Sequence, residues 1–206
     1  MTSVPIGPHY EFMATGRPKE FDYDQALKAA MKQFWSVGFT ATSLQDLLRV
    51  MGLSKSSFYQ TFGSKHELFL RCLELYQSRL IQRLKGQMAG EWSGIGFIRN
   101  LFSEVILEAS RPEKYGCLLV NTAGEFAQRD TEIAQLVSRG LEKLRQLFLR
   151  AIRQAQSQGD VESEKDAELL ARYLVTTICG IRSMIKGGTE KKDLEMVVKI
   201  ALGVLG

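Results

Sequence analysis

Cysteine and histidine are scarce in this 206-residue chain, which has three of the first and two of the second. Cys72, Cys117 and Cys179 are odd in number and widely spaced, so they predict neither a disulfide framework nor a metal-ligand cluster, and they fit a reducing compartment. His9 and His66 have no partner at catalytic or metal-binding spacing, and no HExxH, P-loop or nucleophile-elbow pattern is present. The sequence therefore gives little support to an enzyme, and it predicts no metal and no cofactor.

Long apolar stretches are also missing. The longest segment without a charged residue runs from Gln33 to Gln45, whereas a membrane-spanning helix needs about 20 apolar residues. The N-terminus lacks the apolar core of a signal peptide, so the expected location is the cytoplasm. No segment shows the alternation of apolar and polar residues that is typical of a half-buried strand. The composition is that of an ordinary globular protein, and the pattern predicts an all-α fold.

The net charge of +4 is unevenly distributed along the chain. Residues 1–86 contain 11 Lys and Arg against 7 Asp and Glu, whereas residues 87–206 contain 16 of each. A positive surplus in one segment suits a phosphate-binding surface, although a surplus of this size also arises by chance.

Residues 42–62, TSLQDLLRVMGLSKSSFYQTF, predict two short helices joined by a tight turn. Thr42 or Ser43 can cap the first helix, and leucines at positions 44, 47 and 48 give it one apolar face. Gly52 can adopt the left-handed conformation that ends a helix, and Ser54 can cap the next one. This is the helix-turn-helix pattern, whose second helix enters a DNA major groove.

The second of these helices, from Lys55 to about Thr61, has two different faces. Phe58 and Phe62 are spaced to pack onto the first helix. The other positions supply hydroxyl, amide and ammonium groups, which suit phosphates and base edges. An ordinary exposed amphipathic helix would have a similar composition, so composition alone leaves both alternatives open.

A wider set of residues decides between these alternatives by type and spacing: Gly38-Phe39, Thr42-Ser43, Gly52-Leu53-Ser54, Ser57-Phe58-Tyr59, Phe62, Ser64-Lys65 and Leu68. Together they resemble the DNA-binding domain of TetR/AcrR-type transcriptional regulators, over roughly residues 20–80. The periodicity along the chain predicts an all-α protein of about nine helices, and the resemblance implies how they are divided. A three-helix DNA-binding domain, with its helix-turn-helix at residues 43–62, would precede a C-terminal bundle for ligand binding and dimerisation.

We expect the DNA contacts to come from this domain and from the basic arm before it. Arg17 lies in that arm and suits the minor groove, where negative potential attracts arginine, unless the arm is a solvated tail. The residues expected to touch bases are Gln45, Ser57 and Tyr59, those expected to touch phosphates are Thr42, Lys55, Gln60 and Lys65, and Ser43 and Ser56 belong to the same surface.

Periodicity and capping residues predict the remaining helices. One over about residues 23–37 is capped by Asp22, and a long one capped by Ser64 ends near Lys85. A loop is expected over residues 86–96, followed by helices over about 95–109, 116–126, 131–158, 163–186 and 191–204. The predicted domains are a flexible basic leader (1–19), the DNA-binding domain (20–80) and the C-terminal domain (86–206). Met13 opens a segment that looks like a natural start in this family, so residues 1–12 are either an extension or a start-site choice.

The C-terminal domain is expected to form a homodimer through its last two helices, as the resemblance implies. These helices carry more apolar surface than one bundle needs. In addition, an operator with two half-sites requires two DNA-binding domains. Alternatively, the helix over about residues 163–186 is simply central to its own bundle.

The expected sensor is less defined. Gly116-Cys117-Leu118 resembles a TetR subset that includes repressors responsive to electrophiles or oxidants, and a helix N-terminus favours the Cys117 thiolate. Lys186 could add positive charge there, whereas the alternative for Cys117 is a small buried hydrophobe. Further candidates for a ligand pocket, each of which also suits core or surface, are Phe97, Phe102, Asn121, Glu125, Tyr173 and Thr177.

The sequence thus predicts a cytoplasmic, homodimeric repressor that a small molecule or thiol oxidation releases from a palindromic double-stranded DNA operator. Repression rather than activation rests on the resemblance alone. The alternatives are a helical interaction protein without DNA activity and an α-helical enzyme.

Overall fold

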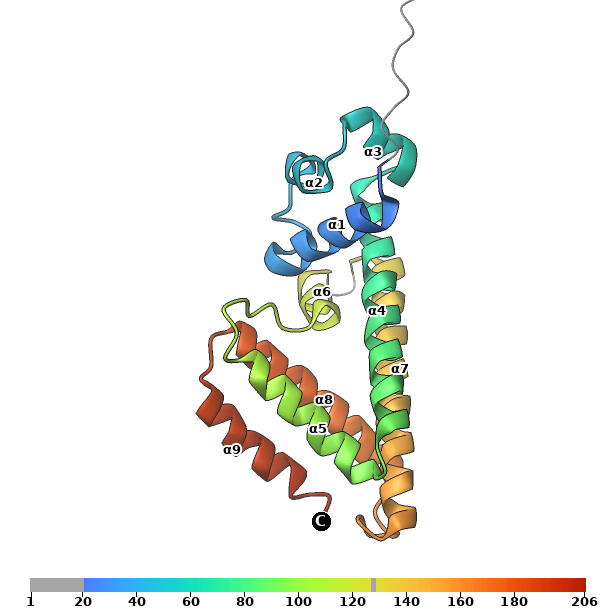
Figure 1. Ribbon diagram of the computed structural model, residues 1–206, viewed down its shortest axis with the longest axis vertical. Coiled ribbons are helices and arrows are strands. Elements are labelled where there is room, and N and C mark those ends of the chain that lie inside the picture. The colour runs from blue at the N-terminus through green and yellow to red at the C-terminus, as the bar shows by residue number, and fades with distance from the viewer. Residues whose placement is uncertain (1–20, 127–128) are drawn as a thin grey trace, which may run out of the picture.

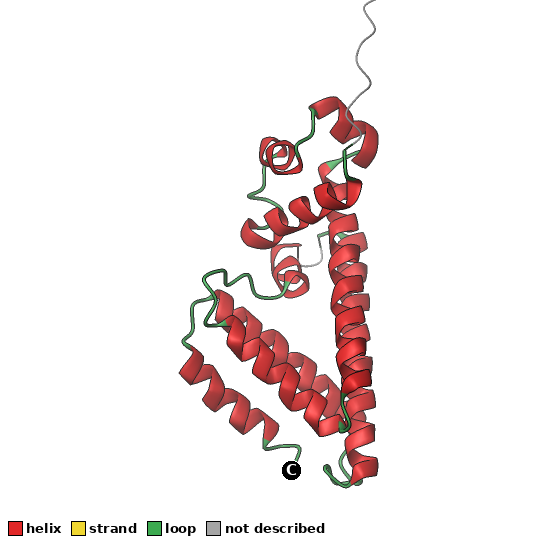
Figure 2. Ribbon diagram, viewed as in Figure 1, coloured by secondary structure: helices red, strands yellow, loops and turns green. Residues whose placement is uncertain are grey.

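The computed structural model describes residues 21–126 and 129–206 of the chain. Within these ranges the protein has nine α-helices and no strand (Figures 1 and 2), which confirms the predicted all-α fold. No helix there combines the length and hydropathy that a membrane crossing needs. The expected leader, with Arg17, lies outside the described residues.

The first three helices are α1 (Tyr23–Val37), α2 (Leu44–Met51) and α3 (Lys55–Phe62), and each begins where a capping side chain is available. Asp22, Ser43 and Ser54 accept backbone N–H groups of Gln25, Asp46 and Ser57, respectively. Of the two cap candidates for α2, Ser43 is therefore the cap. Gly52 ends α2 with a φ of 66°, which favours glycine.

Two helices run side by side along the long axis of the molecule, α4 (Lys65–Gly90) and α7 (Thr131–Gln158) (Figure 1). The first part of α4 packs into the core shared with α1, α2 and α3 through Phe69 and Leu73, and its second part packs into the C-terminal core through Leu84. His66, which has no partner at catalytic or metal-binding spacing in the sequence, lies 2.7 Å from Asp130, the N-cap of α7. Helix α4 is therefore one continuous helix that belongs to both cores.

The expected loop over residues 86–96 is wrong for most of its length. Helix α4 continues to Gly90 and α5 (Gly94–Glu108) begins four residues later. Leu84 is buried and Met88, one turn further on, is packed against the same core. This packing offsets the cost of about 1 kcal/mol that each helical glycine carries relative to alanine.

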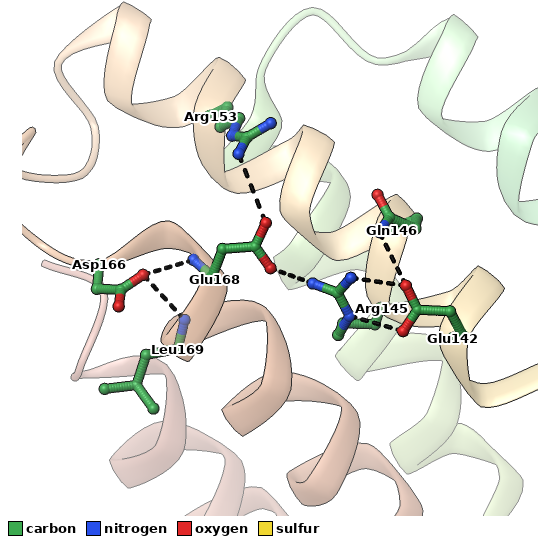
Figure 3. Close-up of polar contacts among 7 residues, drawn as sticks. All are labelled: Glu142, Arg145, Gln146, Arg153, Asp166, Glu168 and Leu169. Atoms are coloured by element: carbon green, nitrogen blue, oxygen red, sulfur yellow. Dashed lines mark hydrogen bonds and ion pairs between the residues drawn. The ribbon is translucent and has the colours of Figure 1, made fainter. Parts of the chain in front are cut away.

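The C-terminal bundle is completed by α6 (Leu118–Phe126), α8 (Ala167–Lys186) and α9 (Lys191–Leu202). Helices α5 and α8 pack on α7, and α9 packs on α5. The predicted start of α8 at Ser163 is wrong, because Asp166 is the N-cap and accepts the N–H groups of both Glu168 and Leu169 (Figure 3). A carboxylate makes stronger, charge-assisted bonds at this position than a serine hydroxyl does.

An ion-pair network ties the beginning of α8 to α7 (Figure 3). The Arg145 guanidinium lies 2.6 Å from Glu142 and also pairs with Glu168. Its hydrogen bond to Glu142 is the main cause that lowers the pKa of that carboxyl to about 2. Because both carboxylates of this network are exposed, although Arg145 is half-buried, the network orients the first turn of α8 more than it stabilises the fold.

Candidate DNA interface and effector region

Helix α3 separates a buried aromatic face from an exposed polar face. Phe58 and Phe62 are fully buried, and the ring of Tyr59 meets Phe58 edge-on at 5.4 Å between centroids while remaining 47% exposed. Lys55, Ser56 and Gln60 are exposed beside it. The buried pair therefore holds the polar side chains of a short helix in place on the surface of the domain.

The other predicted DNA contacts differ in how accessible they are. Ser43 and Gln45 are exposed at the beginning of α2, whereas Ser57 is half-buried and its hydroxyl lies 2.9 Å from that of Ser54. Thr42 is fully buried and its hydroxyl donates to the carbonyl of Gly38. Its position therefore gives no support to the phosphate contact expected of its side chain.

Lys65, at the first position of α4, is half-buried rather than free in solvent. Its ammonium lies 4.3 Å from the ring centroid of Phe39, a cation–π geometry. Burial lowers the pKa of Lys65, an effect that the charge of Glu125 partly offsets. Lys65 is thus held between the DNA-binding helices and α6.

Glu125 connects α6 directly to the segment between α1 and α2. Its carboxylate accepts the backbone N–H of Phe39 at 2.9 Å and that of Thr40 at 2.5 Å. Burial raises the pKa of Glu125, but these hydrogen bonds and the charge of Lys65 outweigh it, so the pKa lies below the ordinary value. The next residue, Phe126, packs its ring against those of Phe39 and Phe69. The end of α6 is therefore clamped to the DNA-binding domain.

The beginning of α6 is equally constrained. Gly116 has a φ of 68°, and a Cβ at this position would lie 2.9 Å from the backbone oxygen of Arg182 and 3.2 Å from the Cβ of Lys186. The Gly116 carbonyl accepts the indole N–H of Trp35 from α1. A glycine is required here because the backbone is left-handed and α8 approaches closely.

Cys117 follows directly and is buried. The Tyr76 hydroxyl donates to its sulfur at 3.7 Å, and burial together with the neighbouring Cys117 raises the pKa of Tyr76 well above its ordinary value. Cys179, on α8, packs against the C-terminal core, and burial is the main cause that raises its pKa to about 12. The structure thus brings Cys117 and Tyr76 together at the beginning of α6.

Arg182 is the residue of this region that the sequence reasoning missed. It is only 7% exposed, and its guanidinium lies 2.7 Å from Glu108 of α5. Burial opposes its charge, but Tyr76 and Glu108 more than compensate, so the pKa of Arg182 is raised. The available signal was one arginine within the apolar run Ile178–Ile185, because a buried charge requires a partner.

The structure does not gather the other predicted ligand residues into one pocket. Phe97 and Phe102 lie within the C-terminal core. Asn121 donates to the Tyr115 carbonyl, and the side chains of Tyr173 and Thr177 hydrogen-bond to backbone oxygens of α9 and α8, respectively. Lys186 is exposed at the end of α8.

Comparisons with known proteins match nearly the whole chain to one family of transcriptional regulators. The family described as bacterial regulatory proteins, tetR family, matches residues 26–72, and the tetracyclin repressor-like C-terminal domain matches residues 94–200. An uncharacterized HTH-type transcriptional regulator of Bacillus subtilis, YezE, is 31% identical over 92% of this chain and 99% of its own. The HTH-type transcriptional repressor ComR of Escherichia coli is 29% identical over 90% of this chain and 88% of its own.

Solved structures give the same result. A cysteine mutant of the TetR family transcriptional regulator CifR, complexed with 26-bp operator DNA, is 28% identical with a TM-score of 0.81, over 93% of this chain and all of that chain. The reduced form of Escherichia coli NemR has the same fold, with a TM-score of 0.79 and 20% identity over 89% of this chain and 96% of its own.

The fold and the exposed face of α3 define a DNA-binding transcriptional regulator. The chain belongs to the TetR family of bacterial regulatory proteins. Both the resemblance seen in the sequence and the expectation of a regulator rather than an enzyme are thereby confirmed.

Proposed function

We propose that this protein is a homodimeric repressor that binds a near-palindromic operator and leaves it when a small molecule binds or a thiol is oxidised. The observation that carries the DNA-binding part is the division of α3, in which two buried aromatic rings hold an exposed polar face. The operator complex of CifR supports the use of this face in a major groove. The base and phosphate contacts expected from the sequence remain part of the proposal, with the exposed residues Gln45, Lys55, Tyr59 and Gln60 as its strongest members.

The last two helices support a dimer. Helix α8 leaves Leu169 and Met184 exposed, and α9 leaves Met196, Val197 and Ile200 exposed. A Cβ added at Gly180, in the second half of α8, would meet nothing within 4 Å beyond its own stretch of helix in the part of the chain that the structure describes. A glycine on an exposed helix face lets a second backbone approach closely, so these surfaces suit a second copy of the chain.

The release step has two candidate triggers, a ligand and the Cys117 thiol. The second is favoured by the position of Cys117 between Tyr76 of α4 and the start of α6, because α6 ends on the DNA-binding domain. Oxidation by hydrogen peroxide would convert the thiol to sulfenic acid and release water. The added oxygen would crowd a buried site and disturb the contacts at the beginning of α6.

The proposal is tested by fluorescence anisotropy with DNA that flanks the protein's own gene, in excess competitor DNA, before and after hydrogen peroxide. We expect tight binding that peroxide weakens, and we expect Cys117→Ser to bind tightly in both conditions. Cys72→Ser is the matched control, because Cys72 is a buried thiol of the DNA-binding core. Tight binding that is indifferent to peroxide would exclude the thiol and leave a ligand as the trigger. If no specific binding occurs, a random-sequence DNA selection distinguishes a distant operator from a wrong assignment.

Lys65→Gln tests the predicted phosphate contact. If Lys65 neutralises one phosphate, the variant should bind all sequences more weakly, and the slope of log affinity against log salt should fall in magnitude by about 0.9. An unchanged slope would assign Lys65 solely to its contacts with Phe39 and Glu125. Lys28→Gln, on α1, is the control for a general loss of positive charge.

A further inference from the structure

A cavity of about 730 Å³ lies where the DNA-binding helices meet the C-terminal domain. Its walls come from α1, α4, α5, α8 and the segment after α5. Pockets for small organic molecules commonly have volumes of about 300–1,000 Å³, so the cavity is large enough for such an occupant. None of the pocket residues predicted from the sequence lines it.

The charged side chains of this cavity leave a positive surplus. Arginines at positions 79, 83, 111 and 182 line it, against glutamates at positions 104 and 108. Arg83 pairs with Glu104 at 2.8 Å, and Arg182 pairs with Glu108 at 2.7 Å. Across residues 21–126 and 129–206, neither Arg79 nor Arg111 has an acidic partner within 4 Å. An anionic group in the cavity would balance this surplus.

Arg182 provides a second and independent indication that the cavity takes an anionic ligand. It is more than nine-tenths buried, and its Nη2 donates to Glu108. Its Nε is also buried, yet it has no acceptor in the part of the chain that the structure describes. A buried donor without a partner costs free energy, which an acceptor supplied by a ligand recovers. A carboxylate suits an arginine donor because the hydrogen bond is charge-assisted.

Apart from Gln87 and the Tyr76 hydroxyl, the remaining walls are apolar. Trp35 is held by its hydrogen bond to the Gly116 carbonyl, and Leu107 is 52% exposed although it is a large aliphatic side chain. Both line the cavity together with Met31 and Leu80. An occupant with an apolar body would cover these side chains while its charged end met Arg182.

We propose that this cavity binds amphipathic organic carboxylates and that it is the effector site of the repressor, which rests on the function proposed above. The carboxylate is received by Arg182 and Arg79, and the apolar body lies against Trp35 and Leu107. Such a ligand contacts α1 of the DNA-binding domain and lies beside Tyr76, the hydrogen-bond partner of Cys117. Its binding therefore bears on α4, whose Tyr76 also contacts the Cys117 thiol.

Isothermal titration calorimetry of the full chain without DNA tests the site, with 2-naphthoate as the probe and neutral 2-naphthamide as its matched control. We expect naphthoate to bind about tenfold more tightly than the amide, because its hydrogen bonds to arginine are charge-assisted. Arg79→Gln should weaken naphthoate binding about threefold to tenfold, whereas Arg139→Gln, in a separate groove between α4 and α7, should not change it. The double substitution Arg182→Gln and Glu108→Gln, which removes both charges of the pair, should abolish the preference for the carboxylate.

Equal or absent binding of the two probes by the native protein would overturn the site, as would an undiminished preference in both the Arg79→Gln and the double variant. Circular dichroism shows whether the double variant folds, and Arg79→Gln keeps the test decisive if it does not. Operator binding is then measured with saturating naphthoate. If operator affinity is unchanged, the effector role is wrong. If naphthoate binds as expected but the protein binds no DNA, the proposed repressor function fails and the carboxylate site stands.

Discussion

Replacing Ile200 with aspartate should convert the protein to a monomer and lower its affinity for the operator by about 10²- to 10⁴-fold. Ile200 is 76% exposed on α9, and Met196 and Val197 are exposed on the same helix. An aspartate placed in an apolar interface would have to be buried without a partner, which disfavours association. Two linked DNA-binding domains bind an operator about 10²- to 10⁴-fold more tightly than one domain does, and a monomer loses this gain in affinity.

Light scattering coupled to size-exclusion chromatography measures the mass of the variant, and anisotropy measures its operator affinity. Trp92→Asp is the matched control, because Trp92 is 94% exposed but lies between α4 and α5. It should remain dimeric and bind the operator like the native protein. A dimeric Ile200→Asp protein with native affinity would contradict an interface that includes α9.

Helix α8 allows the same proposal to be tested from the other side. Gly180→Leu adds an aliphatic side chain where this chain has open space, so the isolated subunit should tolerate it. Relative to glycine, leucine should even stabilise the helix by up to about 1 kcal/mol. In the dimer, however, the added side chain would clash with the second copy, so we expect Gly180→Leu to be a folded monomer. That result would show that the dimer is lost through contact with the second copy and not through unfolding.

The parts of the fold that the sequence predicted well depend on neighbours within one helical turn. The caps at Asp22, Ser43 and Ser54 and the apolar face around Leu47 are local patterns, and the structure has them at the expected residues. The end of α4 was missed because Gly86 and Gly90 disfavour a helix locally, while packing of Met88 against the core favours it. Local propensity is a weak guide wherever tertiary contacts oppose it.

The effector region was harder to predict for the same reason. The contact of Glu125 with Phe39 joins residues 86 positions apart, and that of Arg182 with Glu108 joins residues 74 positions apart. Neither contact follows from spacing, because each depends on how α6 and α8 pack against the rest of the molecule. The motif at Gly116 and Cys117 is local, but its contacts with Tyr76 and Trp35 come from other helices.

Glu125→Ala should loosen the attachment of α6 to the DNA-binding domain without unfolding either. The substitution removes an acceptor that holds the N–H groups of Phe39 and Thr40 and leaves Lys65 without its acidic neighbour. Because the contact is partly exposed, we expect a loss of about 1 kcal/mol, somewhat below the range of about 1.5–3 kcal/mol for hydrogen bonds to a charged group. Hydrogen exchange should therefore show faster exchange of the amides of Phe39 and Thr40, while those of α7 stay protected.

The functional effect should be larger than the effect on stability. If α6 transmits the state of Cys117 or of the arginine-lined cavity, its clamp carries the coupling between effector and operator, which for allosteric proteins is typically about 1–3 kcal/mol, or about 5- to 150-fold. Glu125→Ala should then bind the operator in the absence of effector but respond little to peroxide or 2-naphthoate. Glu132→Ala, an exposed carboxylate in the first turn of α7, is the control. A native-sized response in Glu125→Ala would show that the signal reaches α1 by another route, of which the hydrogen bond between Trp35 and the Gly116 carbonyl is the most direct.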